Sequence, residues 1–420
     1  MHDLSEVVVP ALGGPQGRRA RRLSSAQALA IALALTALPA IFAVLRQVSC
    51  LQTGWGGRAP LWRECSSSLM TAFIDDHLTR GLAAYAQGEI TIAQPPGSAA
   101  VMSALGGLVP ETGGLASQRW YLALWLLVAL IALLVTVALV DRTVSEPRRD
   151  VLQAAVAPVL ALGLLLGPDM VGVALATAGI WAWGRHRPAL AGALLGAGVL
   201  TRTYPGLLAI VISLVVVFAP DSPTPQVRSQ LRRLWLALIG TVAIGVGMML
   251  ASNPSGLLTA YQQWWSGPPG AGSFWMIPSM AGAPLDGRIA AVLSLLGVAI
   301  ALSLGIAMVR GARVPVTVAQ AALLVVAVVV ITSKNLPVQS SLWLVPLVAL
   351  AGVPWRDHLV WAAAEGAHYV ALWYYLGGLE VPDKGLPAPW YTIFLLLRLA
   401  AIGRLAWRMW DRAMWPSLAD

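Results

Sequence analysis

The sequence predicts an all-α, polytopic membrane protein with about twelve transmembrane helices. Of its 420 residues, 58% are hydrophobic and only 11% are charged. This composition leaves too little polar surface to cover a water-soluble globule of that size. The hydrophobic residues form long runs and the basic residues gather between them, as expected when lipid is the solvent for the runs and arginines set the topology.

Twelve apolar runs are candidates for crossing the hydrocarbon core, which needs about 20 helical residues when the helix spans it fully. Shorter runs are tolerated where neighbouring helices shield them. The predicted runs cover residues 24–45, 120–140, 151–167, 170–184, 189–201, 206–219, 234–251, 288–309, 314–332, 340–353, 358–377 and 389–409. The first run is too long for a signal-peptide core and no clean cleavage site follows it, so we interpret it as a retained helix.

The arginines orient these helices. With the amino terminus in the cytoplasm, the cytoplasmic connections contain 18 of the 28 basic residues, although the exported loops are longer. This distribution predicts a bacterial plasma-membrane protein with both termini inside. We divide the chain into a cytoplasmic tail (1–23), a membrane domain (24–409) and a second tail (410–420). The net charge of +9 does not indicate a nucleic-acid partner, because the arginines occur in short clusters.

The first exported loop, residues 46–119, contains most of the polar residues outside the cytoplasmic connections. Cys50 and Cys65 both lie in it, on the oxidising side, where a disulfide and two free thiols are both compatible with the sequence. The stretch from Phe73 to Gln87 predicts one amphipathic helix whose apolar face rests on the membrane surface. The sequence predicts no soluble domain.

Two adjacent carboxylates in that stretch, Asp75 and Asp76, are candidates for a general base that deprotonates a hydroxyl. The alternative is that they are solvated acids, favoured near a helix amino terminus by the helix dipole. The sequence contains no Walker loop, HExxH or CxxC motif, so nothing supports nucleotide hydrolysis or a zinc site.

Two basic residues on the exported side have two interpretations each. Arg202, in a Thr-Arg-Thr-Tyr-Pro segment, and Lys334, before Asn335, are candidates for binding a lipid phosphate. Both could equally extend their charges to the headgroup region without binding substrate.

Acidic and aromatic residues elsewhere leave similar alternatives. Glu365 and His368 share a face within one span and suit either a proton relay or a structural contact. Asp169 follows Gly167 and Pro168 at a tight exported turn and is a further acidic candidate, or simply part of the turn. Trp264 and Trp275 suit an interfacial aromatic belt or sugar stacking.

Together these segments resemble the GT-C superfamily of membrane glycosyltransferases, specifically the actinobacterial mannosyltransferases that use polyprenyl-phosphate mannose. An acidic residue, a glycine and a Tyr-Pro-Pro element follow one another in the first exported loop of that family. Asp75, Gly88 and Gln94-Pro95-Pro96 occur here in that order, with glutamine in place of tyrosine. The similarity continues over Arg187–Gly196, Arg202–Pro205 and the late segments Ser333–Gln339 and Leu342–Leu347.

The resemblance implies an inverting transfer of a sugar, expected to be mannose, from a polyprenyl-phosphate donor to a lipid-linked or cell-envelope glycan on the exported face. It implies no cofactor and leaves the need for a divalent metal open. The implied partners are membrane lipids, the donor and the acceptor. The implied site comprises Asp75 or Asp76 as the base, Arg202 and Lys334 at the donor phosphate, and Gln94, Tyr204, Gln339, Trp264 and Trp275 at the substrate.

Two other functions compete with transfer. A secondary transporter or lipid-glycan flippase also suits twelve helices and the intramembrane pair Glu365 and His368. The placement of the one long polar loop after the first helix alone is unlike the related halves that transporters commonly have. A non-catalytic scaffold for envelope assembly is the third possibility.

Overall fold

The structure is a computed structural model that describes residues 25–110, 112–144, 147–219 and 224–415. The described residues form helices joined by turns and contain no strand. The predicted amino-terminal tail, with the cluster from Arg18 to Arg22, lies outside the described residues, as do residues 416–420 of the second tail. The start of the second tail, up to Met414, continues α21 (Ala388–Met414). Within the described ranges, five helical segments are long and apolar enough to cross a membrane: α2 with α3 (Ala26–Thr53), α8 (Gly114–Asp141), α14 (Pro225–Ser252), α17 (Gly287–Gly311) and α21 (Ala388–Met414).

Each of the twelve predicted apolar runs contains helix. Within the first of the five long segments, α2 covers Ser25–Leu35 and α3 covers Ala37–Thr53. The other runs contain α9 (Pro147–Ala155), α10 (Pro158–Gly163), α11 (Asp169–Gly184), α12 (Pro188–Thr201), α13 (Tyr204–Phe218), α18 (Val318–Thr332), η3 (Val338–Trp343), α19 (Leu344–Leu350) and α20 (Trp355–Glu380). The sequence thus predicted the positions of these helices.

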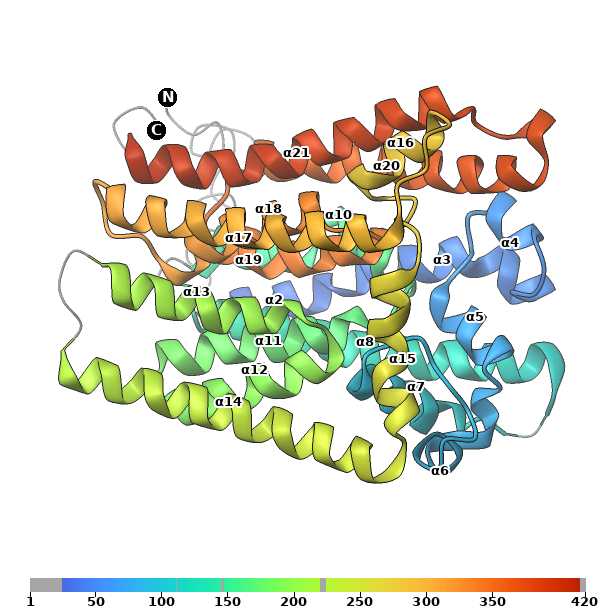
Figure 1. Cartoon of the computed structure of the whole chain (residues 1–420), viewed down its shortest axis with the longest axis horizontal. Coiled ribbons are helices and arrows are strands. Elements are labelled where there is room, and N and C mark those ends of the chain that lie inside the picture. The colour runs from blue at the N-terminus through green and yellow to red at the C-terminus, as the bar shows by residue number, and fades with distance from the viewer. Residues whose placement is uncertain (1–24, 111, 145–146, 220–223, 416–420) are drawn as a thin grey trace.

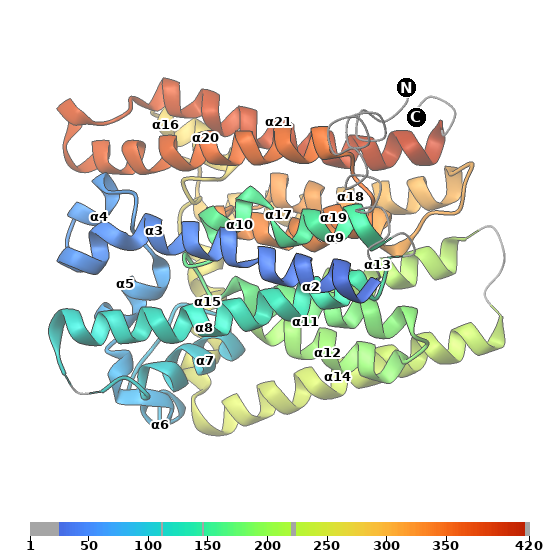
Figure 2. The same ribbon diagram turned by 180° about the vertical axis from the view of Figure 1, so that it is seen from behind.

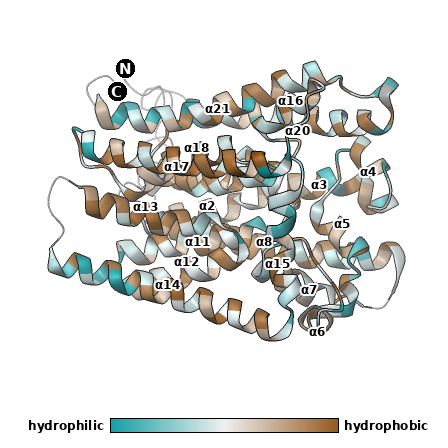
Figure 3. Ribbon diagram, viewed as in Figure 1, coloured by the Kyte–Doolittle hydropathy of each residue, from teal (hydrophilic) through white to brown (hydrophobic). Residues whose placement is uncertain are grey.

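The helices that lie mainly outside the apolar runs gather at one end of the bundle. Figures 1 and 2 show α4 to α7 at the end opposite to the one where α21 finishes, and α15 inclined steeply across the ends of the longer helices. In Figure 3 the hydrophobic residues cover the long middle stretches of the helices, and hydrophilic residues are concentrated at their ends and in the loops. These short elements are α4 (Ala59–Trp62), α5 (Ser68–Asp75), η1 (Leu78–Arg80), α6 (Gly81–Ala86), α7 (Pro96–Gly106), α15 (Pro254–Ser266), η2 (Phe274–Met276), α16 (Ile277–Met280) and η4 (Pro382–Lys384).

Glycines let α12 pack closely against α14. A Cβ added at Gly192 would lie 2.0 Å from the backbone oxygen of Leu234, and one at Gly196 would lie 2.8 Å from that of Leu238. Only glycine permits such a backbone approach, which is how helices associate tightly where lipid removes the hydrophobic driving force.

The prediction of a single amphipathic helix over Phe73–Gln87 is wrong. The stretch is divided among α5, η1 and α6, because His77 (φ 52°) and Gly81 (φ 77°) adopt left-handed backbone conformations that interrupt an α-helix. Gly81 also packs against Gly107, whose Cα would lie 3.2 Å from a Cβ at that position. The segment therefore folds back against α7 and forms a compact layer.

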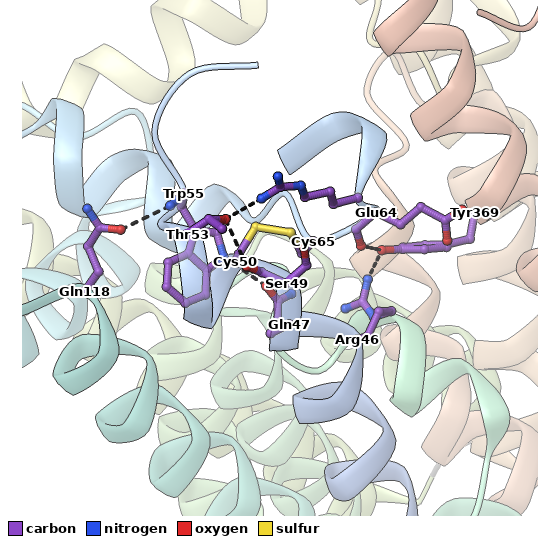
Figure 4. Close-up of a disulfide and its surroundings, with 11 residues drawn as sticks. Arg46, Gln47, Ser49, Cys50, Thr53, Trp55, Glu64, Cys65, Gln118 and Tyr369 are labelled. Atoms are coloured by element: carbon purple, nitrogen blue, oxygen red, sulfur yellow. Dashed lines mark hydrogen bonds between the residues drawn. A yellow bond between two sulfur atoms is a disulfide. The ribbon is translucent and has the colours of Figure 1, made fainter. Parts of the chain in front are cut away.

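A disulfide fixes the start of this layer. Cys50, in α3, is bonded to Cys65, and the loop between them contacts two other helices (Figure 4). The backbone N–H of Trp55 donates to Gln118 of α8 at 3.1 Å, and the Tyr369 hydroxyl of α20 donates to the backbone oxygen of Glu64 at 2.5 Å. The chain therefore enters α5 from a point that is covalently tied to α3 and hydrogen-bonded to α20.

Loss of this disulfide is expected to destabilise the protein. The bond joins residues 15 apart in sequence, for which chain entropy alone corresponds to about 3 kcal/mol. We expect Cys50→Ser, Cys65→Ser and the double variant to lower the unfolding temperature by the same amount in lipid, and a reductant to lower that of the wild type equally. An unchanged unfolding temperature in reductant would contradict the structure of this loop.

Candidate functional site

A cavity of about 600 Å³ lies where the first loop meets two later loops and α20. One part of its wall is polar and another, formed by Leu372, Trp373 and Leu376 of α20, is apolar. The polar side chains come from the first loop and from the segment before η3 and its first turn: Ser66, Ser68, Thr71, Asp75, Asp76, Gln94, Asn335 and Gln339. Segments more than 250 residues apart in sequence thus line one cavity.

The helix α5 places the two carboxylates in this cavity. It begins with hydrogen bonds from the hydroxyls of Ser67 and Ser68 to the backbone oxygens of Leu165 and Leu166, both at 2.6 Å. These carbonyls follow the short helix α10 and have no partner within it, so the serines satisfy them. On the opposite side, the buried ring of Phe73 stacks on Tyr121 of α8 with 4.3 Å between ring centroids. Asp75 and Asp76 follow at the end of this fixed helix.

The two carboxylates differ in their surroundings. Asp75 is exposed, whereas Asp76 is half-buried. Burial raises the pKa of the Asp76 carboxyl above its ordinary value, the charge of Asp75 raises it further, and His77 opposes the rise. A raised pKa makes the Asp76 carboxylate more basic than an ordinary aspartate once it is deprotonated, which is the property that a general base needs.

Gln94 lines the same wall, and its side chain accepts a hydrogen bond from Arg202. The Nη1 group of Arg202 donates to Gln94 Oε1 at 2.8 Å. The other side of the guanidinium binds Asp169, with Nε to Oδ1 at 2.8 Å and Nη2 to Oδ2 at 3.0 Å. Trp343 Nε1 also donates to Asp169 Oδ1, at 3.0 Å. Arg202 therefore stands next to the cavity wall, with a buried carboxylate as its partner.

Lys334 is buried and turned away from the cavity. Its Nζ donates to the backbone oxygen of Trp264 and, at 3.1 Å, to that of Trp265. These carbonyls lie in the last turn of α15, where a cation satisfies them and opposes the helix dipole. Its neighbours Asn335 and Gln339 line the cavity. The segment from Lys334 to Gln339 thus contributes its amides to the wall and its lysine to α15.

The remaining predicted substrate residues lie outside the cavity wall. Tyr204 is buried and stacks on Trp343, with ring centroids 4.6 Å apart. Trp275 Nε1 donates to the backbone oxygen of Thr332 at 2.8 Å, and the ring of Trp264 lies 5.7 Å from Lys334 Nζ. Of the five residues that the resemblance assigned to substrate, Gln94 and Gln339 line the cavity and these three do not.

Glu365 belongs to a buried network that supports the cavity wall. Arg398 Nε donates to Glu365 Oε2 at 2.9 Å, and both side chains are fully buried. The same arginine donates to the backbone oxygens of Leu336 and Pro337, which line the cavity, and to Ser341 Oγ. Sequence analysis missed Arg398, although an arginine surrounded by leucines in an apolar run is itself a signal of a buried partner.

His368 has a separate contact. Its Nε2 lies 3.1 Å from the Tyr391 hydroxyl, which donates to the backbone oxygen of Ala271 at 2.7 Å. Ala271 also lines the cavity. Glu365 and His368 therefore have different partners, and each supports a different loop of the wall.

The described residues contain no group of three or more His, Cys, Asp or Glu side chains placed to hold a metal ion. Within the cavity, Asp75 and Asp76 form the acidic pair.

Breaking the Glu365–Arg398 pair is expected to destabilise the fold strongly. Glu365→Gln leaves a buried guanidinium without its counter-charge, which costs about 3–5 kcal/mol. The matched control is Glu380→Gln, because Glu380 pairs with Arg58 at an exposed position, where a loss of about 1 kcal/mol or less is expected. Unfolding in lipid measures both. Equal losses would show that the buried network does not support the fold.

Comparison with known proteins adds no relative: no family model, no curated protein and no solved structure matches this chain. Its function must therefore be argued from the cavity.

Proposed function

We propose that this protein is an integral membrane glycosyltransferase. It moves a sugar, expected to be mannose from the resemblance in sequence, from a polyprenyl-phosphate donor to a hydroxyl of a lipid-linked or cell-envelope glycan on the exported face. The observation that supports this most directly is that Asp75, Asp76, Gln94 and Gln339, all assigned to a glycosyltransferase site by the resemblance, line the same cavity.

The composition of the cavity suits a sugar attached to a lipid. Its volume of about 600 Å³ is within the usual range for small-molecule sites, about 300–1,000 Å³. Carboxylates and amides hydrogen-bond sugar hydroxyls, whereas the wall formed by Leu372, Trp373 and Leu376 offers apolar surface to a prenyl chain. A lipid-borne donor also agrees with the sequence-based expectation that the chain has no soluble nucleotide-binding domain.

The proposed reaction is a single displacement with inversion. The acceptor oxygen attacks the anomeric carbon of the sugar while the bond from that carbon to the phosphate oxygen breaks. The polyprenyl phosphate leaves with the bonding electrons, and a carboxylate takes the proton of the acceptor hydroxyl. We assign this role to Asp76, because its pKa is raised, with Asp75 beside it.

The contacts of Glu365 and His368 favour transfer over ion-coupled transport. Both residues were the intramembrane candidates for a proton relay. Glu365 is instead ion-paired with Arg398, and His368 is paired with Tyr391.

Removing the base is expected to abolish transfer. In purified protein reconstituted in lipid, given radiolabelled polyprenyl-phosphate mannose and a membrane-lipid acceptor extract, Asp76→Asn should reduce the transfer rate by about 10²–10⁴-fold. Glu89→Gln is the control, since Glu89 lies in the same loop but pairs with Arg80 at an exposed position. Full activity in Asp76→Asn would refute the assignment, and no transfer by the wild type would refute the proposed function.

The transfer rate should depend on pH through Asp76. The base must be deprotonated, so the rate falls as the pH decreases through its pKa, and the raised pKa places this fall above the pH expected for an ordinary aspartate. Asp75→Asn removes a neighbouring negative charge and lowers that pKa, so the fall should move to lower pH. A pH–rate profile measures this shift. An acid limb at the same pH in the wild type and in Asp75→Asn would contradict the coupling.

A further inference from the structure

The guanidinium of Arg202 has most of its donors engaged. Nε and Nη2 bind the two oxygens of Asp169, and Nη1 donates to Gln94 Oε1 and to the backbone oxygen of Thr201 at 3.2 Å. Its side chain is only 11% exposed and that of Asp169 is 2% exposed. A substrate phosphate would have to displace a bidentate carboxylate to bind this arginine, and such pairs are among the strongest hydrogen-bonded contacts in proteins.

Asp169 is itself fixed by its position. It is the first residue of α11, where the helix dipole favours a negative charge. Trp343 Nε1 donates to it, and the ring of Trp343 is stacked on Tyr204. The carboxylate is therefore a rigid anchor for Arg202.

This arrangement determines which way the Gln94 amide faces. Arginine is only a hydrogen-bond donor, so the atom of Gln94 that meets Nη1 must be the carbonyl oxygen, and the NH₂ group must point elsewhere. Gln94 lines the cavity. The rigid chain from Asp169 through Arg202 to Gln94 therefore presents an amide donor at the cavity wall.

The cavity wall suits an uncharged ligand group. None of the described residues that line it is a lysine, arginine or histidine. Its hydrogen-bonding side chains are carboxylates, hydroxyls, the amides of Gln94, Asn335 and Gln339, and the indole of Trp373. A sugar ring matches this set, because each hydroxyl can donate to a carboxylate and accept from an amide.

We propose that Gln94 donates a hydrogen bond to a hydroxyl of the sugar, and that Asp169 and Arg202 are positioning residues that hold Gln94 in this orientation. This rests on the proposed function and changes the role that the sequence suggested for Arg202, from a phosphate ligand to a support for a sugar ligand. Gln94 thereby contributes to recognition of the sugar and not of the lipid phosphate.

The test compares the binding of two lipids to the full-length protein in detergent by native mass spectrometry: polyprenyl-phosphate mannose and sugar-free polyprenyl phosphate of the same chain length. Gln94→Met should weaken binding of the sugar-bearing lipid by about tenfold, the value of one lost hydrogen bond, and leave the sugar-free lipid unchanged. Gln94→Leu should do the same, because it also removes the amide donor. Gln263→Met, at an exposed position of α15, is the matched control.

Variants of the positioning residues separate this role from phosphate binding. Asp169→Asn should weaken only the sugar-bearing lipid. If Arg202 instead binds the phosphate, Asp169→Asn frees its charge and tightens binding of both lipids, while Arg202→Met weakens both. Either pattern overturns the inference, as does unchanged binding of both lipids in Gln94→Met. The Gln94 variants decide the question even if the Asp169 and Arg202 variants fail to fold.

The transfer assay distinguishes the inference from the function on which it rests. A wild type that binds the sugar-bearing lipid but transfers no sugar refutes the proposed function, and the Gln94 comparison still decides the inference. A wild type that binds neither lipid overturns both.

Discussion

Two buried pairs between an arginine and a carboxylate hold the walls of the cavity, and the arrangement of the site depends on them. Arg202 with Asp169 fixes the side where the first loop meets α11 and α12, and Arg398 with Glu365 fixes the segment that precedes η3. Charges inside an assembly of apolar helices are costly and persist only with good partners. In this chain, each pair also hydrogen-bonds a part of the cavity wall that is not held by regular helix.

These hydrogen bonds to the cavity wall explain why buried charges are useful among apolar helices. Backbone that leaves the helical conformation inside an apolar assembly exposes carbonyl groups that water cannot reach. Arg398 donates to the backbone oxygens of Leu336 and Pro337, and the hydroxyls of Ser67 and Ser68 serve Leu165 and Leu166. The irregular segments can therefore curve around a cavity. If these segments were continuous helices, they would fill the cavity, or there would be no turn at which polar side chains could come together.

The sequence predicted the helices well because their signal is local. A run of apolar residues identifies a helix in lipid from its own composition, and each of the twelve runs contains helix. The first loop was predicted less well: the division of Phe73–Gln87 depends on the backbone of His77 and on the contact of Gly81 with Gly107, which lies 26 residues away. An amphipathic pattern alone contains no information about such a contact.

The sequence predicted four residues that share the cavity but not the contacts of the others. Asp75, Gln94 and Gln339 were singled out from the resemblance and Asp76 from its place beside Asp75, and all four line the cavity. The pairing of Arg202 with Asp169 and of Lys334 with the end of α15 joins residues 33 and about 70 positions apart. The sequence predicted that Arg202 and Lys334 bind a phosphate. Only the fold shows that both side chains already donate their hydrogen bonds to other acceptors.

In the proposed function, the sugar of a polyprenyl-phosphate donor occupies this cavity. The most direct measurement is an electron cryo-microscopy structure of the protein in a lipid nanodisc with polyprenyl-phosphate mannose and no acceptor. We expect density for the sugar between Asp76 and Gln94, with the prenyl chain along Leu372 and Leu376. Density for the donor at another place, with this cavity empty, would contradict it.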